Sequence, residues 1–352
     1  MSSRAGVPGT AAGSVEFRRV AVIGLGLIGG SLLRRLAGPR PPDTGAVGPD
    51  GAVCETVGYD RDPGTRDAAS AAGHTVAPTL ADAVGGQGGA DLVVVATPLR
   101  ALPGVLADLA VALRPDAVLT DVASVKVAAR DAVRAANLLG TYVGGHPMAG
   151  TERSGFDASD PGLFDGAAWV LCLDGGTDLV GWLALARLVT AIGCRVVPAG
   201  AAEHDAAAAR ISGLPHVLAA VLAATAGTTG LAPALAAGSY RDGTRVAGTR
   251  PDLAAALCDG NRIAVADTLD EALDRLTAAR DTLRAGGSVL PLCSEGYAAR
   301  RRWEPGGVRG EWFELDAGDP DLRDRLRALG AGGGHVRSVS GRALRCWRPA
   351  GL

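Results

Sequence analysis

The chain has 352 residues, which is enough for two or three domains with a sizeable buried core. Its 35 basic and 37 acidic side chains give a formal net charge of -2, which argues against a protein that binds nucleic acid by neutralising phosphates. The 51 glycines and 20 prolines are dispersed along the chain, so collagen-like and wholly disordered proteins are also excluded.

The cysteines and the first residues favour a cytoplasmic protein. The six cysteines lie far apart and form no CxxC pair, so we predict free thiols in a reducing compartment and no metal site. Residues 1–17 are small, polar and Gly-rich, which indicates a disordered N-terminus without a secretory signal. We find no apolar run long enough to cross a bilayer, and we expect neither a membrane nor a nucleic acid as partner.

Residues 18–200 alternate short apolar runs with longer helix-like segments, which predicts a Rossmann-type, doubly wound parallel sheet in an α/β domain. The predicted strands are 20–23, 53–59, 92–96, 118–122, 142–144, 169–173 and 195–197. A Gly- and Pro-rich stretch at 38–52 is expected to be a surface loop between the first helix and the second strand.

A glycine-rich segment directly follows the first predicted strand and opens a helix. In its GxGxxG pattern, Gly24 permits a tight turn, Gly26 lets the backbone approach a pyrophosphate, and Gly29 allows close packing of helix on strand. Leu27 and Ile28 open the helix, whose N-terminus would hold that pyrophosphate. This context predicts a dinucleotide-binding domain rather than a structural turn.

The ends of the next two predicted strands carry further candidate cofactor contacts. Asp60 can accept hydrogen bonds from both hydroxyls of an adenosine ribose and would repel a 2′-phosphate, so NAD is predicted as the cofactor. Arg61 keeps NADP open, because an arginine there could bind that phosphate. Thr97 and Pro98 follow the third strand and are expected to border the cofactor.

Two later segments carry candidate catalytic groups. His146 stands among glycines and a proline at the end of a predicted strand, as a general base on a loop facing a crevice would. Ser124 ends another strand at the same edge and could orient the imidazole. Lys126 is the one lysine among the 35 basic residues, which suggests that a compact ammonium is needed there, near cofactor or substrate anions. A hydrogen-bonded turn histidine and a solvated lysine remain the structural alternatives.

Residues 201–285 are rich in Ala and Leu, which predicts an all-helical substrate and dimerisation domain. These helices are too uniformly apolar to be solvated on every face, so we expect a homodimer. Pro215 should free the carbonyl of Ile211 and kink the helix between Ser212 and His216. Residues 286–352 are expected to form a small C-terminal extension, a degenerate regulatory β-α-β unit. Its strands are predicted at 311–315 and 343–347, and its helix at 320–329.

Five segments together resemble the prephenate and arogenate dehydrogenase family of the tyrosine pathway. They are Gly24-Leu-Gly-Leu-Ile-Gly29, Asp121-Val-Ala-Ser-Val-Lys126, Gly145-His-Pro-Met-Ala-Gly-Thr-Glu-Arg-Ser-Gly155, Ser212-Gly-Leu-Pro-His216 and Asp242-Gly-Thr-Arg-Val-Ala247. The first segment is shared by many dehydrogenases, whereas the one around His146 is specific. The resemblance covers residues 18–285 and leaves the tail aside.

The resemblance implies roles for individual residues. It makes His146 the general base, with Ser124 hydrogen-bonded to it and to the reacting hydroxyl, and it places Arg245 on a substrate carboxylate. It also implies a substrate pocket lined by the residues His216, Ser212, Thr151 and Glu152. One position departs from the pattern, because Gly213 stands where many relatives carry a second histidine.

These observations predict an NAD-dependent prephenate dehydrogenase, which converts prephenate to 4-hydroxyphenylpyruvate by oxidation and decarboxylation. Neutral His146 suits the base, since the ordinary pKa of histidine is ~6.5, and the fork of Arg245 suits a dianionic substrate. The alternatives are an arogenate dehydrogenase, a β-hydroxyacid-type dehydrogenase that shares only the glycine pattern, or a catalytically silent dinucleotide sensor.

Overall fold

The structure, a computed structural model, describes residues 17–38, 54–85, 88–151, 153–304 and 308–350. Its N-terminal part is a five-stranded parallel sheet in the order β2-β1-β3-β4-β5. These strands are β1 (Arg19–Ile23), β2 (Glu55–Tyr59), β3 (Leu92–Val95), β4 (Val118–Asp121) and β5 (Tyr142–Val143). The predicted Rossmann-type sheet is therefore confirmed. The expectations for the N-terminus and for most of the 38–52 loop lie outside the described residues.

Both faces of this sheet are covered, as consecutive apolar residues predict. Along β1, Val20 and Val22 belong to one hydrophobic cluster, and Ala21 and Ile23 belong to the other. The helices of this part are α1 (Leu27–Ala37), α2 (Pro63–Ala71), α3 (Leu80–Gly85), α4 (Leu102–Ala112) and α5 (Lys126–Ala135). The chain runs from β1 to β2 on one side of β1, and then to β3 on the other side. The carboxyl ends of β1 and β3 therefore form the topological switch point, where ligands of such folds bind.

The last predicted strands do not continue this sheet. A second, six-stranded sheet has the order β6-β7-β8-β10-β11-β9, and only its β7–β8 pair is parallel. Its strands are β6 (Gly145–Pro147), β7 (Ala168–Cys172), β8 (Arg195–Ala199), β9 (Gly310–Asp316), β10 (His335–Ser340) and β11 (Ala343–Pro349), and α6 (Leu179–Ala191) packs on it. Apolar runs predict that a strand is buried, but they do not say which neighbour it pairs with.

The C-terminal extension is part of the α/β half. Leu322 and Leu326 of α14 (Leu322–Ala331) lie in the same hydrophobic cluster as Leu171 of β7, and Val336 of β10 pairs with Val196 of β8. The predicted strand–helix–strand elements are present, but the sequence analysis missed β10, so the unit is β-α-β-β. The boundary at 285 also differs from the structure, because α13 (Leu290–Trp303) continues the helical part.

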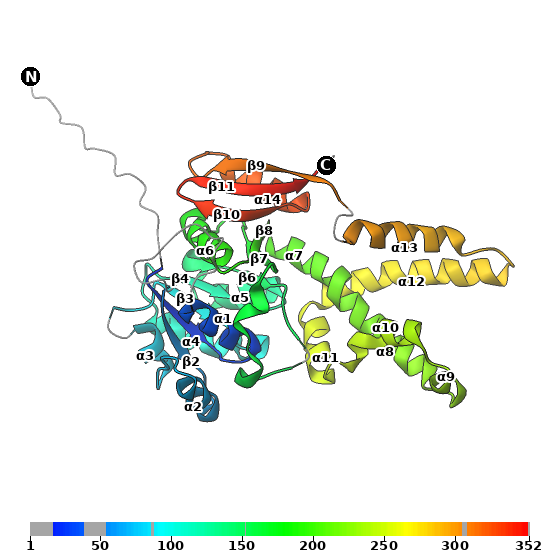
Figure 1. Cartoon of the computed structure of the whole chain (residues 1–352), viewed down its shortest axis with the longest axis horizontal. Helices are drawn as coiled ribbons and strands as arrows, with labels where there is room; N and C mark the ends of the chain where they lie inside the picture. Colours follow the sequence, from blue (N-terminus) through cyan, green and yellow to red (C-terminus); the bar gives the residue numbers. More distant parts are fainter. Residues whose placement is uncertain (1–16, 39–53, 86–87, 152, 305–307, 351–352) are drawn as a thin grey trace, which may run out of the picture.

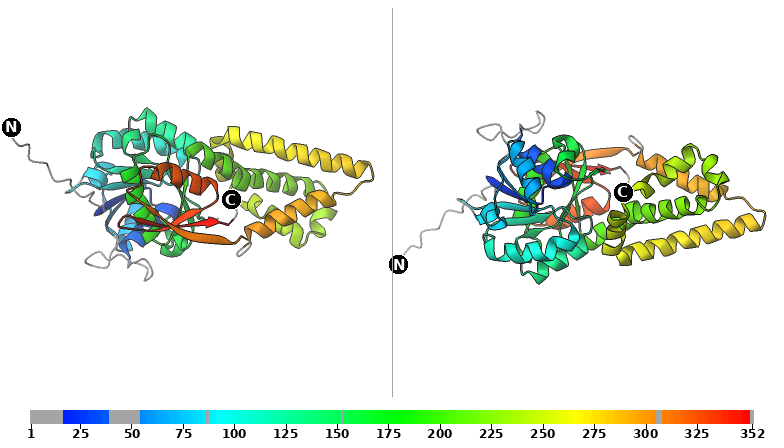
Figure 2. Two further views of the ribbon diagram at one scale, coloured as in Figure 1. Left: turned by 90° about the horizontal axis from the view of Figure 1, so that it is seen from above. Right: turned by 90° about the horizontal axis from the view of Figure 1, so that it is seen from below.

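The helical part projects from the α/β half (Figures 1 and 2). It contains α7 (Ala201–Ala208), a π-helical turn (Ala209–Gly213), α8 (Leu214–Ala226), α9 (Leu231–Ala234), α10 (Gly238–Thr244), α11 (Pro251–Gly260), α12 (Arg262–Arg284) and α13. The π-helical turn precedes Pro215, so the predicted disturbance of the helix takes this form.

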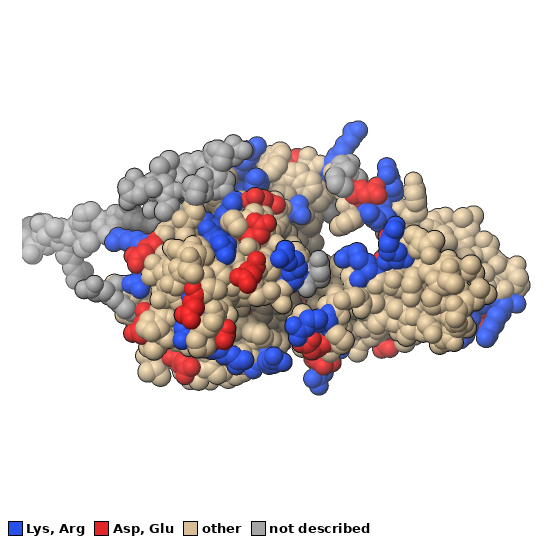
Figure 3. All heavy atoms as spheres, turned by 60° about the horizontal axis from the view of Figure 1, so that its bottom comes forward, with Lys and Arg blue, Asp and Glu red and all other residues tan. Residues whose placement is uncertain are grey.

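A large apolar surface lies on this helical part. Residues 211–240 contain no Asp, Glu, Lys or Arg, and Figure 3 shows a broad area without charged side chains over the helical part. Val221, Leu222, Leu231 and Leu235 are 57%, 44%, 68% and 71% exposed. Such a contiguous apolar area is typical of a protein–protein contact.

One expectation about membranes was wrong. The continuous helix of residues 201–226, formed by α7, the π-helical turn and α8, is long and apolar enough to span a bilayer by length and composition. Glu203, His204, Asp205 and Arg210 interrupt the apolar residues of this helix in the sequence. Two of these, His204 and Asp205, are buried inside the protein, where they join the site described below.

Candidate active site

The glycine-rich loop between β1 and α1 has the geometry that its pattern predicts. Gly24 has a φ of +96°, and a Cβ there would lie 2.7 Å from the carbonyl oxygen of Ala96. A Cβ on Gly29 would lie 1.8 Å from the carbonyl oxygen of Gly24, so helix and loop pack too closely for a side chain. By contrast, a Cβ on Gly26 would meet no atom within 4 Å. Gly26 thus faces open space, as expected where a backbone must accommodate a ligand.

The switch point next to this loop carries an unpartnered polar atom. Thr97 Oγ1 is buried without a hydrogen-bond partner, and its methyl group lies beside Gly24. Pro98, which follows it, is exposed. The first turn of α1, from Leu27 and Ile28 onward, has no side-chain cap, so its N–H groups are available to an anion. An open glycine, a free helix N-terminus and an orphaned hydroxyl together fit a dinucleotide.

Asp60 holds the glycine loop through its carboxylate. Oδ2 accepts a hydrogen bond from the N–H of Leu25 at 2.8 Å, and Oδ1 accepts one from the N–H of Asp62 at 2.9 Å. Each oxygen retains a lone pair for another donor. Asp60 therefore supports the glycine loop, while Arg61 is exposed, and the contact of either residue with a ribose stays a prediction.

Lys126 lies in a buried environment that its sequence neighbours do not indicate. Its side chain is completely buried, and Nζ donates to Asp121 Oδ2 and to the carbonyl oxygen of Gly145, both at 2.5 Å. The other oxygen of Asp121 accepts hydrogen bonds from Tyr142 Oη at 2.7 Å and from the N–H of Gly145 at 3.2 Å. Because the ammonium is enclosed and paired, the expected contact of Lys126 with a cofactor or substrate anion was wrong. It ties β4 to the start of β6 instead.

His146 lies on β6 and is the first member of a hydrogen-bonded chain. Its Nδ1 lies 2.8 Å from Nε2 of His204, and Nδ1 of His204 lies 2.8 Å from Oδ1 of Asp205. The rings of the two histidines meet edge to face, with centroids 5.0 Å apart. Burial, followed by the charges of His204 and Lys126, lowers the pKa of His146 well below its ordinary value. The imidazole is therefore kept neutral, as a general base must be.

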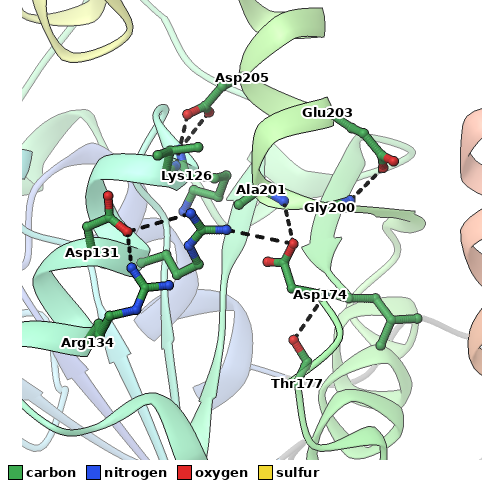
Figure 4. Close-up of polar contacts among 12 residues, drawn as sticks. Lys126, Asp131, Arg134, Asp174, Thr177, Gly200, Ala201, Glu203 and Asp205 are labelled. Carbon is green, nitrogen blue, oxygen red and sulfur yellow. Dashed lines mark hydrogen bonds and ion pairs between the residues drawn. The ribbon is translucent and has the colours of Figure 1, made fainter.

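The carboxylate of Asp205 is fixed by the beginning of α5. Its Oδ1 accepts a hydrogen bond from the N–H of Lys126 at 2.7 Å, and its Oδ2 accepts one from the N–H of Val127 at 2.9 Å (Figure 4). Burial alone would raise the pKa of Asp205, but the hydrogen bonds from His204 and from these two N–H groups outweigh it and lower the pKa. Asp205 is thus an ionised group at a helix N-terminus.

A cavity of about 260 Å³ opens beside His146. Its lining residues come from the loop between β4 and α5, from β6 and the residues after it, and from the helical part: Ser124, Val125, His146, Pro147, Met148, Ala149, Gly150, Ala208, Ser212, Leu257 and Asn261. The structure thus brings together three predicted site residues, Ser124, His146 and Ser212. The imidazole, however, pairs with His204, whereas Ser124 was expected to orient it.

Other predicted substrate-binding residues do not line this cavity. Thr151 and Arg245 are exposed. Nδ1 of His216 lies 2.8 Å from the carbonyl oxygen of Ser212, and its Nε2 lies 3.5 Å from Thr249 Oγ1. Glu152 lies outside the described residues. The roles of these four residues toward a substrate remain predictions.

The missing second histidine has a packing explanation. Gly213 is buried where α12 crosses the π-helical turn, and a Cβ there would lie 2.6 Å from a methyl group of Val265. A larger side chain would force these helices apart. In the described part of the chain, no group of three or more His, Cys, Asp or Glu side chains could hold a metal ion.

His204, Asp205 and Asn261 were not predicted as site residues. Asn261 lines the cavity, and its Nδ2 donates to the carbonyl oxygen of Asp205 at 2.7 Å. A signal was present, because Glu203, His204 and Asp205 place three consecutive ionisable residues at the start of an Ala-rich helix. Without the tertiary fold, nothing indicated that this pair faces His146, 58 residues earlier.

Two family models match the chain. Residues 46–198 match the nucleotide-binding domain of prephenate dehydrogenase, and residues 200–288 match the dimerization domain of prephenate dehydrogenase. The chain is 33% identical to a cyclohexadienyl dehydrogenase of Zymomonas mobilis over 293 residues, which cover 81% of this chain and 95% of that protein.

Solved structures agree with these matches. A Corynebacterium glutamicum protein described as a candidate prephenate dehydrogenase is 38% identical, with a TM-score of 0.79, covering 92% of this chain and 99% of that one. An arogenate dehydrogenase of Synechocystis is 27% identical, with a TM-score of 0.69, covering 81% of this chain and all of the other (100%).

Proposed function

Because the chain belongs to the prephenate dehydrogenase family of oxidoreductases, we propose that it catalyses the NAD-dependent oxidative decarboxylation of prephenate to 4-hydroxyphenylpyruvate. In this reaction the ring C4 loses a hydride to the cofactor and the 4-hydroxyl passes its proton to the base, which leaves a carbonyl. The bond from the ring to its carboxylate then breaks to release carbon dioxide, its electron pair enters the ring, and the oxygen takes a proton back to become the phenol hydroxyl. The ring becomes aromatic, which makes the step irreversible. The protein has to accept one proton and orient the ring.

The observation that carries the proposal is the placement of His146. Its Nδ1 is engaged with His204, so Nε2 is the ring nitrogen left for a molecule in the cavity. Its low pKa keeps the ring neutral, and a substrate hydroxyl within hydrogen-bond reach can pass its proton to Nε2. Ser124 and Ser212 line the same cavity and can donate to or accept from that hydroxyl.

The cofactor assignment depends on the glycine loop and the switch point. The N-terminus of α1 and the open surface at Gly26 would hold the pyrophosphate, and Asp60 would receive the adenosine ribose. When bound there, the nicotinamide supplies the acceptor for the hydride. A negative charge at Asp60 disfavours a 2′-phosphate, so we propose NAD over NADP.

The choice of prephenate over arogenate follows from the charges around the cavity. Arogenate carries an ammonium group, which calls for an acceptor, whereas prephenate carries a keto acid, which calls for donors. Among the described residues that line the cavity, none is acidic. Asp242, a candidate acceptor, is 78% exposed and pairs with Arg241. Arg245 and His216, on the adjoining helical segments, are the proposed donors to the keto acid and carboxylate.

The test is a direct assay of the purified protein with prephenate or arogenate and with NAD or NADP, following the reduced cofactor. We expect the highest kcat/KM for prephenate with NAD. A kcat/KM that favours arogenate by tenfold or more would mean that an unpaired carboxylate faces the pocket and would replace the proposed substrate. Cofactor binding without reduction of cofactor by either substrate would favour the dinucleotide sensor.

We also propose that the helical part forms a homodimer. The uncharged stretch 211–240 leaves apolar side chains exposed on α8 and α9, and the matching family model describes a dimerization domain. A second copy of the same surface is the partner that such a self-complementary apolar face fits. Light scattering with size-exclusion chromatography should give twice the chain mass of 35.3 kDa, and a monomer at micromolar concentration would contradict the proposal.

A further inference from the structure

The two residues behind His146 define a direction for its hydrogen bonds. The carboxylate of Asp205 is ionised and can only accept, so the proton in its bond to His204 belongs to Nδ1 of His204. When His204 is neutral, its Nε2 therefore has a free lone pair and accepts from Nδ1 of His146. With His204 neutral, His146 therefore carries its own proton on Nδ1 and presents an unprotonated Nε2 to the cavity.

We propose that His204 and Asp205 are positioning residues that hold His146 in the Nδ1–H tautomer. In the other tautomer, Nε2 carries the proton and presents the cavity with a donor that cannot take a proton from a hydroxyl. For its catalytic consequence this inference rests on the proposed function, whereas the tautomer itself is a property of the resting protein.

The rest of the network fixes the pair from two sides. On the α5 side, the N–H groups of Lys126 and Val127 hold both oxygens of Asp205, so the carboxylate cannot rotate away from His204. On the α12 side, Asn261 holds the backbone carbonyl of Asp205. Both His204 and Asp205 are 4% exposed, so water does not compete for these hydrogen bonds.

Two charged residues, Lys126 and Asp205, lie near the pair of histidines. The ammonium of Lys126 is paired with Asp121 on the β4 side, and Asp205 lies beyond His204 on the α7 side. After His146 accepts a proton on Nε2, its Nδ1–H bond to His204 remains, and the negative charge of Asp205 lies at the far end of the same chain. The chain thus places a carboxylate two hydrogen bonds away from the proton that His146 accepts, while burial keeps the resting imidazole neutral.

The C-terminal unit supports the beginning of α7, which carries both residues. Glu203, next to His204, accepts a hydrogen bond from the N–H of Gly200 at 2.8 Å and another from Arg327 of α14 at 2.5 Å. Arg327 also donates to the carbonyl oxygen of Leu173 at 2.9 Å. Figure 4 shows Glu203 and Gly200 at this end of the helix, above the Asp174 side chain that accepts from the N–H of Ala201. The extension therefore helps to place the positioning pair.

The first test is nitrogen NMR of the resting protein labelled with ¹⁵N in its histidines, at a pH above the ordinary histidine pKa of ~6.5. The His146 signals are identified by their loss in His146→Asn. We expect the pattern of an Nδ1–H imidazole in the wild type. An Nε2–H pattern for His146 would overturn the proposal, whatever the outcome of the activity assay.

Two variants of His204 sharpen the test. His204→Phe removes the acceptor and should shift His146 toward the Nε2–H tautomer, whereas His204→Gln offers a side-chain oxygen and should retain Nδ1–H. With prephenate and NAD, we expect kcat to fall by roughly 10² in His204→Phe, with a nearly unchanged KM and substantial recovery in His204→Gln. Equal losses in both variants with an unchanged His146 tautomer would reduce the pair to a structural role and refute the inference. A wild type with the expected tautomer but without turnover would instead refute the proposed function alone.

Discussion

The α/β half and the helical half of the molecule bury their side chains differently. Two hydrophobic clusters fill the α/β half, including the C-terminal unit, but none of their residues lies between 201 and 303. The buried ion pair Asp121–Lys126 lies in the α/β half, whereas Arg210–Glu271 and Arg275–Glu295 on the helical half are at least half exposed. The α/β half thus has a complete core as a single chain, and the helical half leaves apolar surface for a partner.

The two halves meet along the helix of residues 201–226. Its first turn places His204 and Asp205 in the buried network of the α/β half, and its later turns expose Leu218, Val221 and Leu222. One continuous helix therefore joins the chemistry to the proposed dimer interface. If this comparison holds, substitutions in the two halves will differ in their effects on catalysis, stability, dimerisation and ligand binding.

The largest effect is expected at His146. His146→Asn should lower kcat by ~10² to 10⁴ while leaving NADH affinity nearly unchanged, because proton transfer occurs in the transition state and the nucleotide loop lies elsewhere. Steady-state kinetics and a fluorescence titration with NADH measure the two quantities. A variant that retains most of its kcat would remove His146 from the base role.

Breaking the buried ion pair should affect stability most. Lys126→Ala leaves the charge of Asp121 buried without its partner, so the free energy of unfolding should fall by about 3–5 kcal/mol in urea denaturation. Arg210→Ala is the control in the helical half, where the pair with Glu271 is exposed and the unfolding midpoint should barely change. Similar midpoints for the two variants would show that burial does not distinguish the halves.

The apolar face should be sensitive to a charge only in the helical half. Leu222→Asp is expected to raise the dissociation constant of the dimer by tenfold or more, because it would bury an unpaired carboxylate in the interface. Val111→Asp, at a residue 91% exposed on α4, is the matched control and should leave the dimer intact. Concentration-dependent light scattering measures the dissociation constant of the dimer in both variants. An unchanged dissociation constant in Leu222→Asp would show that the interface does not include Leu222.

Arg245 tests whether the helical half contributes to substrate binding. Arg245→Lys keeps the charge but loses the planar fork, so KM for prephenate should rise at least tenfold with an unchanged fold. Arg241→Lys changes a neighbouring arginine that is 81% exposed and pairs with Asp242, and it should leave KM as it is. Equal KM values for the two variants would show that Arg245 does not bind the substrate.

The smallest effect is expected at the nucleotide end of the α/β half. Asp60→Ala should reduce the preference for NAD over NADP about tenfold, since the ribose hydroxyls lose an acceptor and a 2′-phosphate loses its repulsion. Asp67→Ala, on the exposed side of α2, serves as control. A wild type that prefers NADP would show that Arg61 governs this site.

Much of the α/β half was predictable because its signals are local. Consecutive apolar residues predict strands buried on both faces, and the φ of Gly24 and the close contact at Gly29 follow from the GxGxxG spacing. His146 could be identified from its own neighbours in the sequence. Its surroundings could not, because the only lysine was interpreted as a ligand for anions, whereas the fold encloses it against Asp121.

The sequence by itself determined the parallel sheet, the dinucleotide loop, the helical composition of the second part and the histidine at the strand end. Only the tertiary structure decided that the strands after Val143 pair in a second sheet, that the C-terminal unit completes that sheet, and that His204 and Asp205 stand behind His146. The physical reason is that backbone conformation and burial depend mainly on neighbouring residues. Which buried polar groups meet depends instead on contacts between segments far apart in the chain, and the sequence pattern does not encode their pairing.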